Sequence, residues 1–284
     1  MNYRHIFHAG NICDVVKHSV LTLVIEHLRG KEAPFCVLDT HAGIGVYDLH
    51  DPRAGKTKEA ADGILKFLDA ARVAELDAYV AVLQKLNVEW DAASSKGFRY
   101  YPGSPLLAQH RLRPQDRLVA CELHPDDAAE LKRQLFPFKQ AQAHHRDGYE
   151  ALGAFLPPAE KRGLVLIDPP FEEPNEFERL ADALHAAYAR WPQGIFMAWY
   201  PIKERPAIWR FHEKLMAGGL PKLLAAEFVY REETDHERLN GSGLILANPP
   251  WQMDDKLKHL FAALHNILET AHNGDNITWL RQPE

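Results

Sequence analysis

The sequence has few cysteines, no excess of basic residues and no long apolar run. Three cysteines occur among its 284 residues, Cys13, Cys36 and Cys121, and no two form a CxxC pair. This spacing argues against a disulfide framework and a cysteine-based zinc site, and we expect Cys36 and Cys121 to be buried in their apolar runs. The apolar runs are too short to cross a bilayer, and the polar, aromatic N-terminus is not a secretory signal. We therefore expect a soluble cytoplasmic protein without a metal.

Basic residues are outnumbered by acidic ones. The chain has 33 Lys and Arg against 39 Asp and Glu, which gives a net charge of −6. Proteins that bind nucleic acid non-specifically usually carry a basic face, because contacts with phosphates dominate that affinity. The overall charge thus counts against a nucleic-acid partner unless basic residues gather locally. The apolar share of 46% is enough for one core, so we expect a single domain over 1–284 that acts as a monomer.

Predicted strands alternate with amphipathic helical patterns along most of the chain. The strands are predicted over 35–39, 118–122, 141–147, 163–168, 195–200, 223–230 and 243–248. Helical spacing of apolar residues covers 12–28, 126–136, 175–190 and 204–217. This alternation predicts an α/β protein with a mainly parallel sheet and helices on both faces. The last two strands, joined by the charged loop 231–241, are expected to form an antiparallel hairpin at the edge of a seven-stranded sheet.

One stretch interrupts the alternation. Residues 55–93 are rich in Ala, Leu, Lys and Glu, with leucines at roughly helical spacing. We expect a small helical insertion over 48–98, between the first and second strands. The segment RYYPGSPLL (99–107) then leads the chain back to the sheet through a Pro-Gly turn.

A glycine-bearing turn directly follows the first strand. In LDTHAGIG (38–45), Gly43 and Gly45 would let backbone N–H groups approach a ligand at the carboxyl end of the sheet. Glu122 ends the second strand, where an acidic residue typically accepts the hydroxyls of a ribose. The usual separation is about 20 residues, and the insertion accounts for the longer one here. The alternatives are a plain strand-to-helix turn with Asp39 capping a loop, and a solvated carboxylate at Glu122.

The segment LVLIDPPF (164–171) is the clearest chemical signal. A buried strand delivers Asp168 at its tip, and two prolines fix the backbone that follows. The adenine N6 amine is a poor nucleophile, because its lone pair is delocalised into the ring. The Asp168 carboxylate and the Pro169 carbonyl can accept its two hydrogens and localise that lone pair for attack on a sulfonium methyl. Phe171, at what the pattern indicates is an exposed turn, can stack on the base. The alternative is a proline-rich turn after a core strand.

The segment LILANPPW (244–251) has the same form as LVLIDPPF. It follows the seventh predicted strand, whereas LVLIDPPF follows the fourth, which adjoins the first strand in this kind of fold. We therefore expect Trp251 to be a packed aromatic residue at the sheet edge.

These motifs resemble the bacterial 23S ribosomal RNA adenine-N6 methyltransferase J family. The likeness spans nearly the whole chain, through YRHIFHAGNICDVVKH (3–18), LDTHAG (38–43), RYYPGSPL (99–106), ELHP (122–125), DG (147–148), RGLVLIDPP (162–170), WYP (199–201) and NPPW (248–251). The resemblance implies a Rossmann-like methyltransferase that uses S-adenosylmethionine and acts on 23S rRNA. The family motif is DPPY, so Phe171 removes a tyrosine hydroxyl and puts fine positioning of the base in doubt.

The resemblance also implies roles for individual residues. Asp168 would be the catalytic carboxylate, with Pro169 and Phe171 beside it. The cofactor would be held by His18, His41, Gly43, Gly45, Ser104, Glu122, Asp147, Gly148 and Asp168. Tyr3, Arg4 and Phe171 would meet the RNA. Without the resemblance, Asp147 and Gly148 could form only a turn and Ser104 only a helix cap.

Two other functions fit parts of the sequence. A DNA adenine-N6 methyltransferase could use the same pocket, although the net acidity and the lack of a recognisable DNA-reading domain weigh against it. The pairs His5/His8 and His144/His145 prompt a metal-dependent protein for the use of external DNA. They lie in different elements without a series of carboxylates, whereas a hydrolytic metal site needs clustered ligands.

Overall fold

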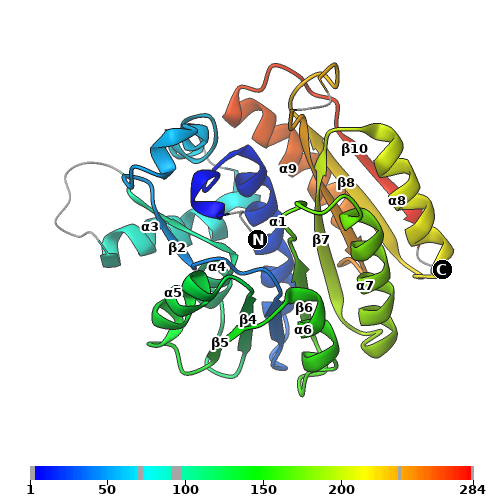
Figure 1. The fold of residues 1–284 in the computed structure, drawn as a ribbon, viewed down its shortest axis with the longest axis horizontal. Coiled ribbons are helices and arrows are strands. Elements are labelled where there is room, and N and C mark those ends of the chain that lie inside the picture. The colour runs from blue at the N-terminus through cyan, green and yellow to red at the C-terminus, as the bar shows by residue number, and fades with distance from the viewer. Residues whose placement is uncertain (1–3, 70–72, 91–97, 236–237, 283–284) are drawn as a thin grey trace.

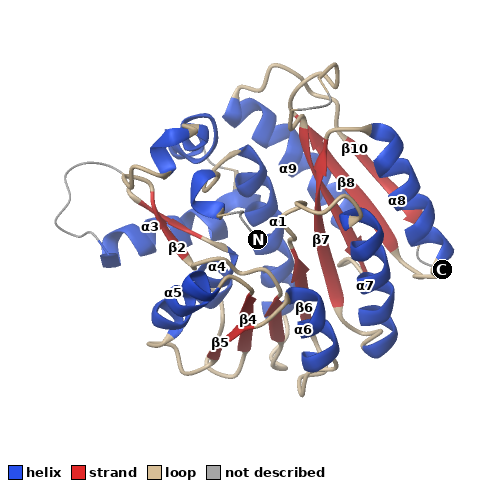
Figure 2. Ribbon diagram, in the orientation of Figure 1, coloured by secondary structure: helices blue, strands red, loops and turns tan. Residues whose placement is uncertain are grey.

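The computed structural model describes residues 4–69, 73–90, 98–235 and 238–282. Its main sheet has eight strands in the order β10-β8-β9-β7-β6-β1-β4-β5. The strands are β1 (Cys36–Asp39), β4 (Arg117–Glu122), β5 (Ala141–His145), β6 (Gly163–Ile167), β7 (Ile195–Ile202), β8 (Leu223–Val229), β9 (Gly241–Ala247) and β10 (Asn276–Arg281). The predicted α/β class is confirmed, and Figures 1 and 2 show helices packed on both sides of the sheet.

The order of the strands determines where a ligand can bind. β1 pairs in parallel with β4 on one side and with β6 on the other. The chain therefore leaves β1 in one direction across the sheet and returns to its other side. In open α/β sheets, ligands bind outside the carboxyl ends of the strands at such a switch point. This brings the residues that follow β1, β4 and β6 to one edge of the sheet.

Helices cover the two faces with separate apolar clusters. One face carries α1 (Ile12–Arg29), α4 (Ser104–Gln109), α5 (Pro125–Leu135) and α9 (Met253–Leu268). The other carries α6 (Gly148–Phe155), α7 (Glu176–Arg190) and α8 (Arg205–Ala217). All three cysteines are buried and free, as expected from apolar surroundings. None of the described helices is both long and apolar enough to span a membrane.

The predicted number of strands was wrong. β10 lies at the edge of the sheet and pairs with β8, so the β8–β9 hairpin is not the edge, and β9 lies between β7 and β8. β10 escaped sequence analysis because its side chains are exposed or only half buried, which leaves no apolar run to reveal a strand. A second small sheet, β2 (Val46–Asp48) with β3 (Tyr100–Pro102), was also missed, because each strand has three residues.

Where the structure describes the chain between β2 and β3, most residues lie in helical segments. They are η2 (Ala54–Lys56), η3 (Ala61–Leu65), α2 (Lys66–Asp69), η4 (Ala74–Leu76) and α3 (Asp77–Trp90). They pack on α1 and α9 beside the main sheet (Figure 1). Residues of this stretch, such as Ile64, Tyr79 and Leu83, belong to the same apolar cluster as α1.

Candidate active site

A cavity of about 530 Å³ lies over the carboxyl ends of β1, β4 and β6. Its lining includes eight of the residues singled out from the sequence, namely His18, His41, Gly43, Ser104, Glu122, Asp168, Pro169 and Phe171. The rest of the lining comes from the N-terminal segment, the helical stretch after β2, the end of β7 and the β8–β9 hairpin. This volume falls within the range of roughly 300–1,000 Å³ that is usual for small-molecule sites.

Among the described residues, four predicted site residues do not line the cavity. Gly45 lies behind it, where an added Cβ would stand 2.8 Å from Leu106. Arg4 forms an ion pair with Asp127 on α5. Asp147 and Gly148 begin α6 next to the cavity, as described below. Tyr3 falls outside the described residues.

The turn after β1 is built for close approach. Gly43 has a φ of +61°, and a Cβ there would stand 2.2 Å from the hydroxyl of Tyr47, so a side chain at this position would be strained. Its N–H donates to Glu122 Oε2 at 2.9 Å, and His124 N–H donates to Oε1 at 2.7 Å. Glu122 is 8% exposed, and burial raises the pKa of its carboxyl. It is thus a buried carboxylate at a strand tip, not a solvated one.

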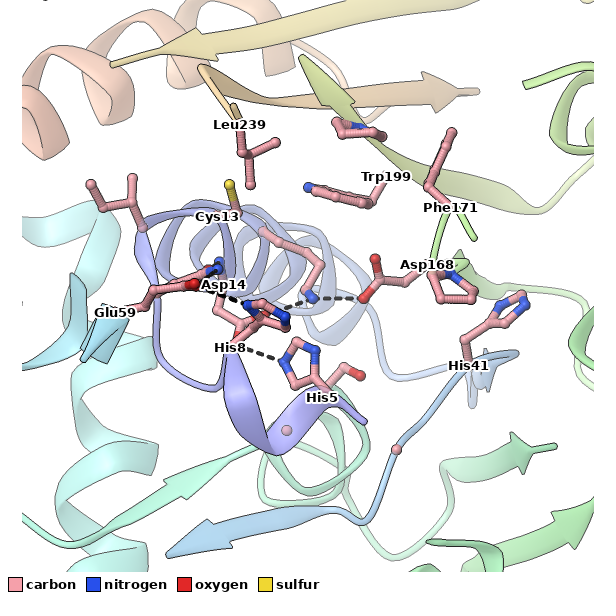
Figure 3. A pocket seen from close by; sticks show the side chains of 18 of the residues that line it. His5, His8, Cys13, Asp14, His41, Glu59, Asp168, Phe171, Trp199 and Leu239 are labelled. Carbon is pink, nitrogen blue, oxygen red and sulfur yellow. Dashed lines mark hydrogen bonds and ion pairs between the residues drawn. The ribbon is translucent and has the colours of Figure 1, made fainter. Parts of the chain in front are cut away.

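Asp168 belongs to a chain of buried charges. Its Oδ2 accepts a hydrogen bond from Lys17 Nζ at 2.6 Å, and the same ammonium donates to Asp14 Oδ1 at 2.8 Å. His5 Nε2 lies 2.8 Å from Asp14 Oδ2. Figure 3 shows this chain crossing from the N-terminal segment to the tip of β6. Among the described residues, Asp168 Oδ2 has the Lys17 hydrogen bond and none is seen to Oδ1, and Asp168 lines the cavity.

The surroundings of Asp14 and Lys17 keep both side chains charged. Burial alone would favour the neutral carboxylic acid at Asp14, but the charges of His5 and Lys17 hold its pKa well below the usual range. Burial likewise opposes the charged form of Lys17, yet Asp14 and Asp168 hold its pKa well above the usual value. Lys17 is therefore an ammonium fixed between two carboxylates.

Sequence reasoning missed Lys17, Asp14 and His5. A signal was present, because Lys17 falls on the apolar face of α1, four residues after Cys13 and three before Val20. A lysine in a buried helical stripe needs a partner of opposite charge. The sequence alone does not say which carboxylate supplies it.

Phe171 has more structural support than its sequence context suggested. Its ring packs edge-on against Phe177 at 4.9 Å and against Trp199 at 5.8 Å between centroids, and it is half buried rather than exposed. The residue has a φ of +51°, a conformation that costs free energy for a non-glycine residue and clusters at functional sites. Phe171 and Trp199 lie together on one side of the Asp168 carboxylate (Figure 3).

His41 joins the turn after β1 to the start of α6. Its Nδ1 lies 2.8 Å from the Thr40 hydroxyl, and burial lowers its pKa to about 4, so the ring is neutral. A Cβ on Gly148 would stand 2.6 Å from the ring. Asp147 caps α6 by accepting hydrogen bonds from the N–H groups of Tyr149 and Glu150. Gly148 therefore permits the helix to abut His41, and Asp147 has a structural role of its own.

Ser104 is not a helix cap, and Trp251 is not a packed residue. Ser104 is the first residue of α4, the N-cap is Gly103, and no side chain caps the helix. Trp251 is 80% exposed, so the prediction of a packed ring was wrong. Because β9 runs antiparallel to β7, the segment NPPW leaves the sheet at the edge opposite Asp168. Asn248 instead bonds the carbonyls of Pro192 and Gly194.

The histidine pairs do not converge on a common point. His8 Nδ1 contacts Glu59 at 3.1 Å, whereas His5 contacts Asp14. His145 contacts the carbonyl of Leu123. Across the described ranges, no group of three or more His, Cys, Asp or Glu side chains could hold a metal ion.

Comparison with known proteins gives consistent relatives. The family model described as ribosomal RNA large subunit methyltransferase D, RlmJ, matches residues 32–281. The ribosomal RNA large subunit methyltransferases J of Escherichia coli and Haemophilus influenzae are 39% and 37% identical over 282 residues, with 99% of each chain covered. The crystal structure of protein LPL1258 from Legionella pneumophila superposes with a TM-score of 0.86 at 32% identity, over 96% of this chain and 98% of that one.

The match to the family model covers most of the chain, and the relatives are similar from end to end. The sheet order with its switch point at β1 agrees with the α/β fold that the sequence predicted, and Glu122 and Asp168 line the same cavity. The chain belongs to the ribosomal RNA large subunit methyltransferase J family.

Proposed function

We propose that the chain transfers a methyl group from S-adenosylmethionine to the N6 amine of an adenine in 23S rRNA. The observation that carries the proposal is Asp168, held by Lys17 at the tip of β6 with one carboxylate oxygen available in the cavity. The names of the relatives support a ribosomal RNA of the large subunit as the substrate. A substrate of this kind implies a cytoplasmic protein.

The residues around the cavity fit S-adenosylmethionine. Gly43 lines the cavity, and Glu122 offers a carboxylate where a ribose would lie. Among the described residues, neither oxygen of the buried Asp39 side chain accepts a hydrogen bond of standard geometry, and such a carboxylate suits a site that receives a cation. His18, His41 and Ser104 would hold the methionine end, and Asp147 and Gly148 would contact the adenine end. Bound there, the cofactor supplies a methyl group on a positively charged sulfur.

The protein's own residues then prepare the amine. Asp168 Oδ1 and the Pro169 carbonyl accept the two hydrogens of N6, which localises the nitrogen lone pair in the direction of the methyl group. The bound cofactor would supply the methyl group to N6 and keep the electron pair of the broken carbon–sulfur bond. The nitrogen then loses one proton to Asp168 or to water. Lys17 keeps the carboxylate in position throughout.

The target base must be unpaired or turned out of its helix to reach this position. Phe171 offers a stacking surface, a contact worth roughly 1–3 kcal/mol per base, and Trp199 supports its ring. Three basic residues, Lys203, Arg231 and Arg238, also line the cavity. They supply local positive charge for a nucleic acid although the net charge is −6. Tyr3 and Arg4 would contact the RNA outside the base.

Asp168→Asn tests the proposal directly. The amide keeps the shape of the side chain but turns one acceptor into a donor, so transfer from labelled S-adenosylmethionine to unmodified 23S rRNA should fall by at least about 10²-fold. The amide also removes one of the two carboxylate partners of the buried Lys17, so the melting temperature should fall. Transfer is therefore compared at a temperature at which thermal unfolding shows the variant to be folded. The matched control is Asp182→Asn, which alters an exposed carboxylate of α7 that pairs with Lys214.

Two results would contradict the proposal. The first is wild-type protein that binds S-adenosylmethionine but leaves 23S rRNA unmethylated. The second is faster methylation of duplex DNA than of 23S rRNA, which would identify a DNA adenine methyltransferase. The mass of the modified nucleoside after digestion identifies N6-methyladenine in either case.

A further inference from the structure

A hydrogen-bonded chain connects the helical stretch after β2 to the cavity. The hydroxyl of Tyr79, on α3, lies 3.1 Å from the hydroxyl of Tyr101, on β3. The Tyr101 hydroxyl lies 2.7 Å from Nδ1 of His18, on α1. All three side chains are buried, and the rings of His18 and Tyr101 are stacked with centroids 5.6 Å apart. His18 forms part of the cavity wall, so its second ring nitrogen is the one that can serve a ligand.

The hydrogens of this chain can be arranged in two directions. In the outward arrangement, His18 Nδ1–H donates to Tyr101, Tyr101 donates to Tyr79, and the Tyr79 hydrogen needs a further acceptor. Tyr79 is fully buried, and Tyr101 is its one hydrogen-bond partner among the described residues. A buried donor without an acceptor is rare and costly. The outward arrangement therefore carries a penalty within the core.

The inward arrangement avoids that penalty. Tyr79 donates to Tyr101, Tyr101 donates to the bare Nδ1 of His18, and the histidine hydrogen is on Nε2. The cost is an oxygen of Tyr79 that accepts no hydrogen bond, which buried groups tolerate better than an unpaired donor. Burial also lowers the pKa of His18 to about 3, so the ring carries one hydrogen at neutral pH.

We infer that Tyr79 and Tyr101 are positioning residues that fix His18 as the Nε2–H tautomer, so that it donates a hydrogen bond into the cavity. The group that it would meet is an acceptor, and in the proposed cofactor the carboxylate of the methionine end is of this kind. That assignment rests on the proposed function. Tyr79 on α3 thus contributes to cofactor affinity although it does not line the cavity.

Nitrogen-15 NMR of the imidazole side chains tests the tautomer in the protein without ligand. Protonated and bare ring nitrogens have well-separated resonances, and a His18→Asn variant assigns the His18 signals by their loss. Wild-type protein should show a hydrogen on Nε2 and a bare Nδ1. In Tyr101→Phe the bare Nδ1 loses its donor, so the two signals should move toward each other as both tautomers become populated. A wild-type protein with the hydrogen on Nδ1 overturns the inference.

Affinity for S-adenosylmethionine tests the consequence. In Tyr101→Phe the dissociation constant should rise about three- to tenfold, the range expected when one hydrogen bond to a charged group is weakened. Tyr79→Phe should have a smaller effect in the same direction, because Tyr101 can still donate. The matched control is Tyr200→Phe, which removes a buried hydroxyl bonded to Glu227 and His212 in the opposite apolar cluster; its affinity should equal that of the wild type.

The outcomes separate this inference from the proposed function. If wild-type protein binds no S-adenosylmethionine, the proposed function fails, while the NMR experiment still decides the tautomer. If wild-type protein binds it but Tyr101→Phe matches Tyr200→Phe in affinity and leaves the His18 signals unchanged, the inference is wrong. Thermal unfolding of each variant shows whether a weaker affinity reflects loss of fold. Tyr101→Phe and Tyr200→Phe should have similar melting temperatures.

Discussion

Asp39 shows how one buried group can oppose folding. It ends β1 with 1% of its surface exposed, and neither carboxylate oxygen accepts a hydrogen bond of standard geometry from the part of the chain that the structure describes. Burial raises its pKa to about 7, the nearby hydroxyl of Ser104 offsets this in part, and the charge of Asp168 adds to it. A carboxylate without a partner in such a place costs stability. Natural proteins keep groups of this kind at functional sites.

Asp39→Asn should stabilise the protein at neutral pH. Since the folded pKa of about 7 exceeds the ordinary value of 3.8, wild-type stability should fall as the pH rises from about 4 to about 7 and then level off. The variant lacks this fall, and at pH 8 it should gain up to about 4 kcal/mol in unfolding free energy. Urea unfolding of the wild type and the variant at pH 5 and pH 8 measures the fall in wild-type stability and the gain in the variant.

Asp48 provides the contrast for that experiment. Its pKa is lowered, chiefly by hydrogen bonds from Arg99. The stability that Asp48 contributes is present above its unfolded pKa and is lost as the pH falls. Asp48→Asn should therefore lose stability at pH 8, the opposite sign from Asp39→Asn. Equal responses of the two variants to pH would show that Asp39 is not strained.

At the scale of the element, α1 connects the N-terminal segment to the sheet through charge. Helical spacing predicted the helix over 12–28, and it runs from Ile12 to Arg29. Asn11 caps it by accepting a hydrogen bond from Asp14 N–H. The helix then places Asp14 and Lys17 one turn apart, so that the ammonium reaches Asp168, which directly follows β6.

Lys17→Met should be strongly destabilising, although methionine fills a similar volume. Removing one partner leaves the Asp14 carboxylate buried with less compensation, which typically costs about 3–5 kcal/mol. The matched control is Lys258→Met, because Lys258 and Asp255 form an ion pair of the same spacing on the exposed face of α9. Chemical unfolding at pH 7 should show no measurable change for the control. A loss as small as that of the control would show that the buried pair contributes little.

Lowering the pH should remove the stability that the ionised Asp14 contributes. The pKa of Asp14 is held well below 3.8, so its stabilising effect is complete above about pH 4 and is lost as the pH falls further. The wild-type protein should therefore lose stability faster than Lys17→Met below that pH.

At the scale of the whole molecule, the cavity collects segments from most of the chain. Its lining comes from the N-terminal segment, α1, the helical stretch after β2, the strand tips and the β8–β9 hairpin. We propose that residues 48–98 are an insertion within one domain, 1–284, and not an independent unit. The apolar cluster shared by α1 and α3 supports this proposal.

S-adenosylmethionine should therefore stabilise the molecule as a unit. At a free concentration of 100 times the dissociation constant, the unfolding free energy should rise by about 2.7 kcal/mol. Calorimetry should show one transition that moves to higher temperature with ligand. A separate early transition unaffected by ligand would mean that the helical stretch unfolds independently, against the single-domain proposal.

The sequence by itself determined the elements that depend on local pattern. Apolar runs marked β1, β4 and β6, helical spacing marked α1 and α7, and the residues at the strand tips identified Glu122 and Asp168 as neighbours in one site. These inferences hold because parallel strands bring their carboxyl ends to a common edge. The family motifs added His18 and His41 to the predicted site, because a histidine by itself says little about its role.

The tertiary structure decided what depends on partners distant along the chain. Lys17 pairs with Asp168, which lies 151 positions further along the sequence. Tyr79 is connected to His18 through Tyr101. The direction of β9 separates NPPW from DPPF, and β10 closes the sheet edge without an apolar run. Local pattern records burial and periodicity, whereas the pairing of buried charges and hydroxyls depends on which elements pack together.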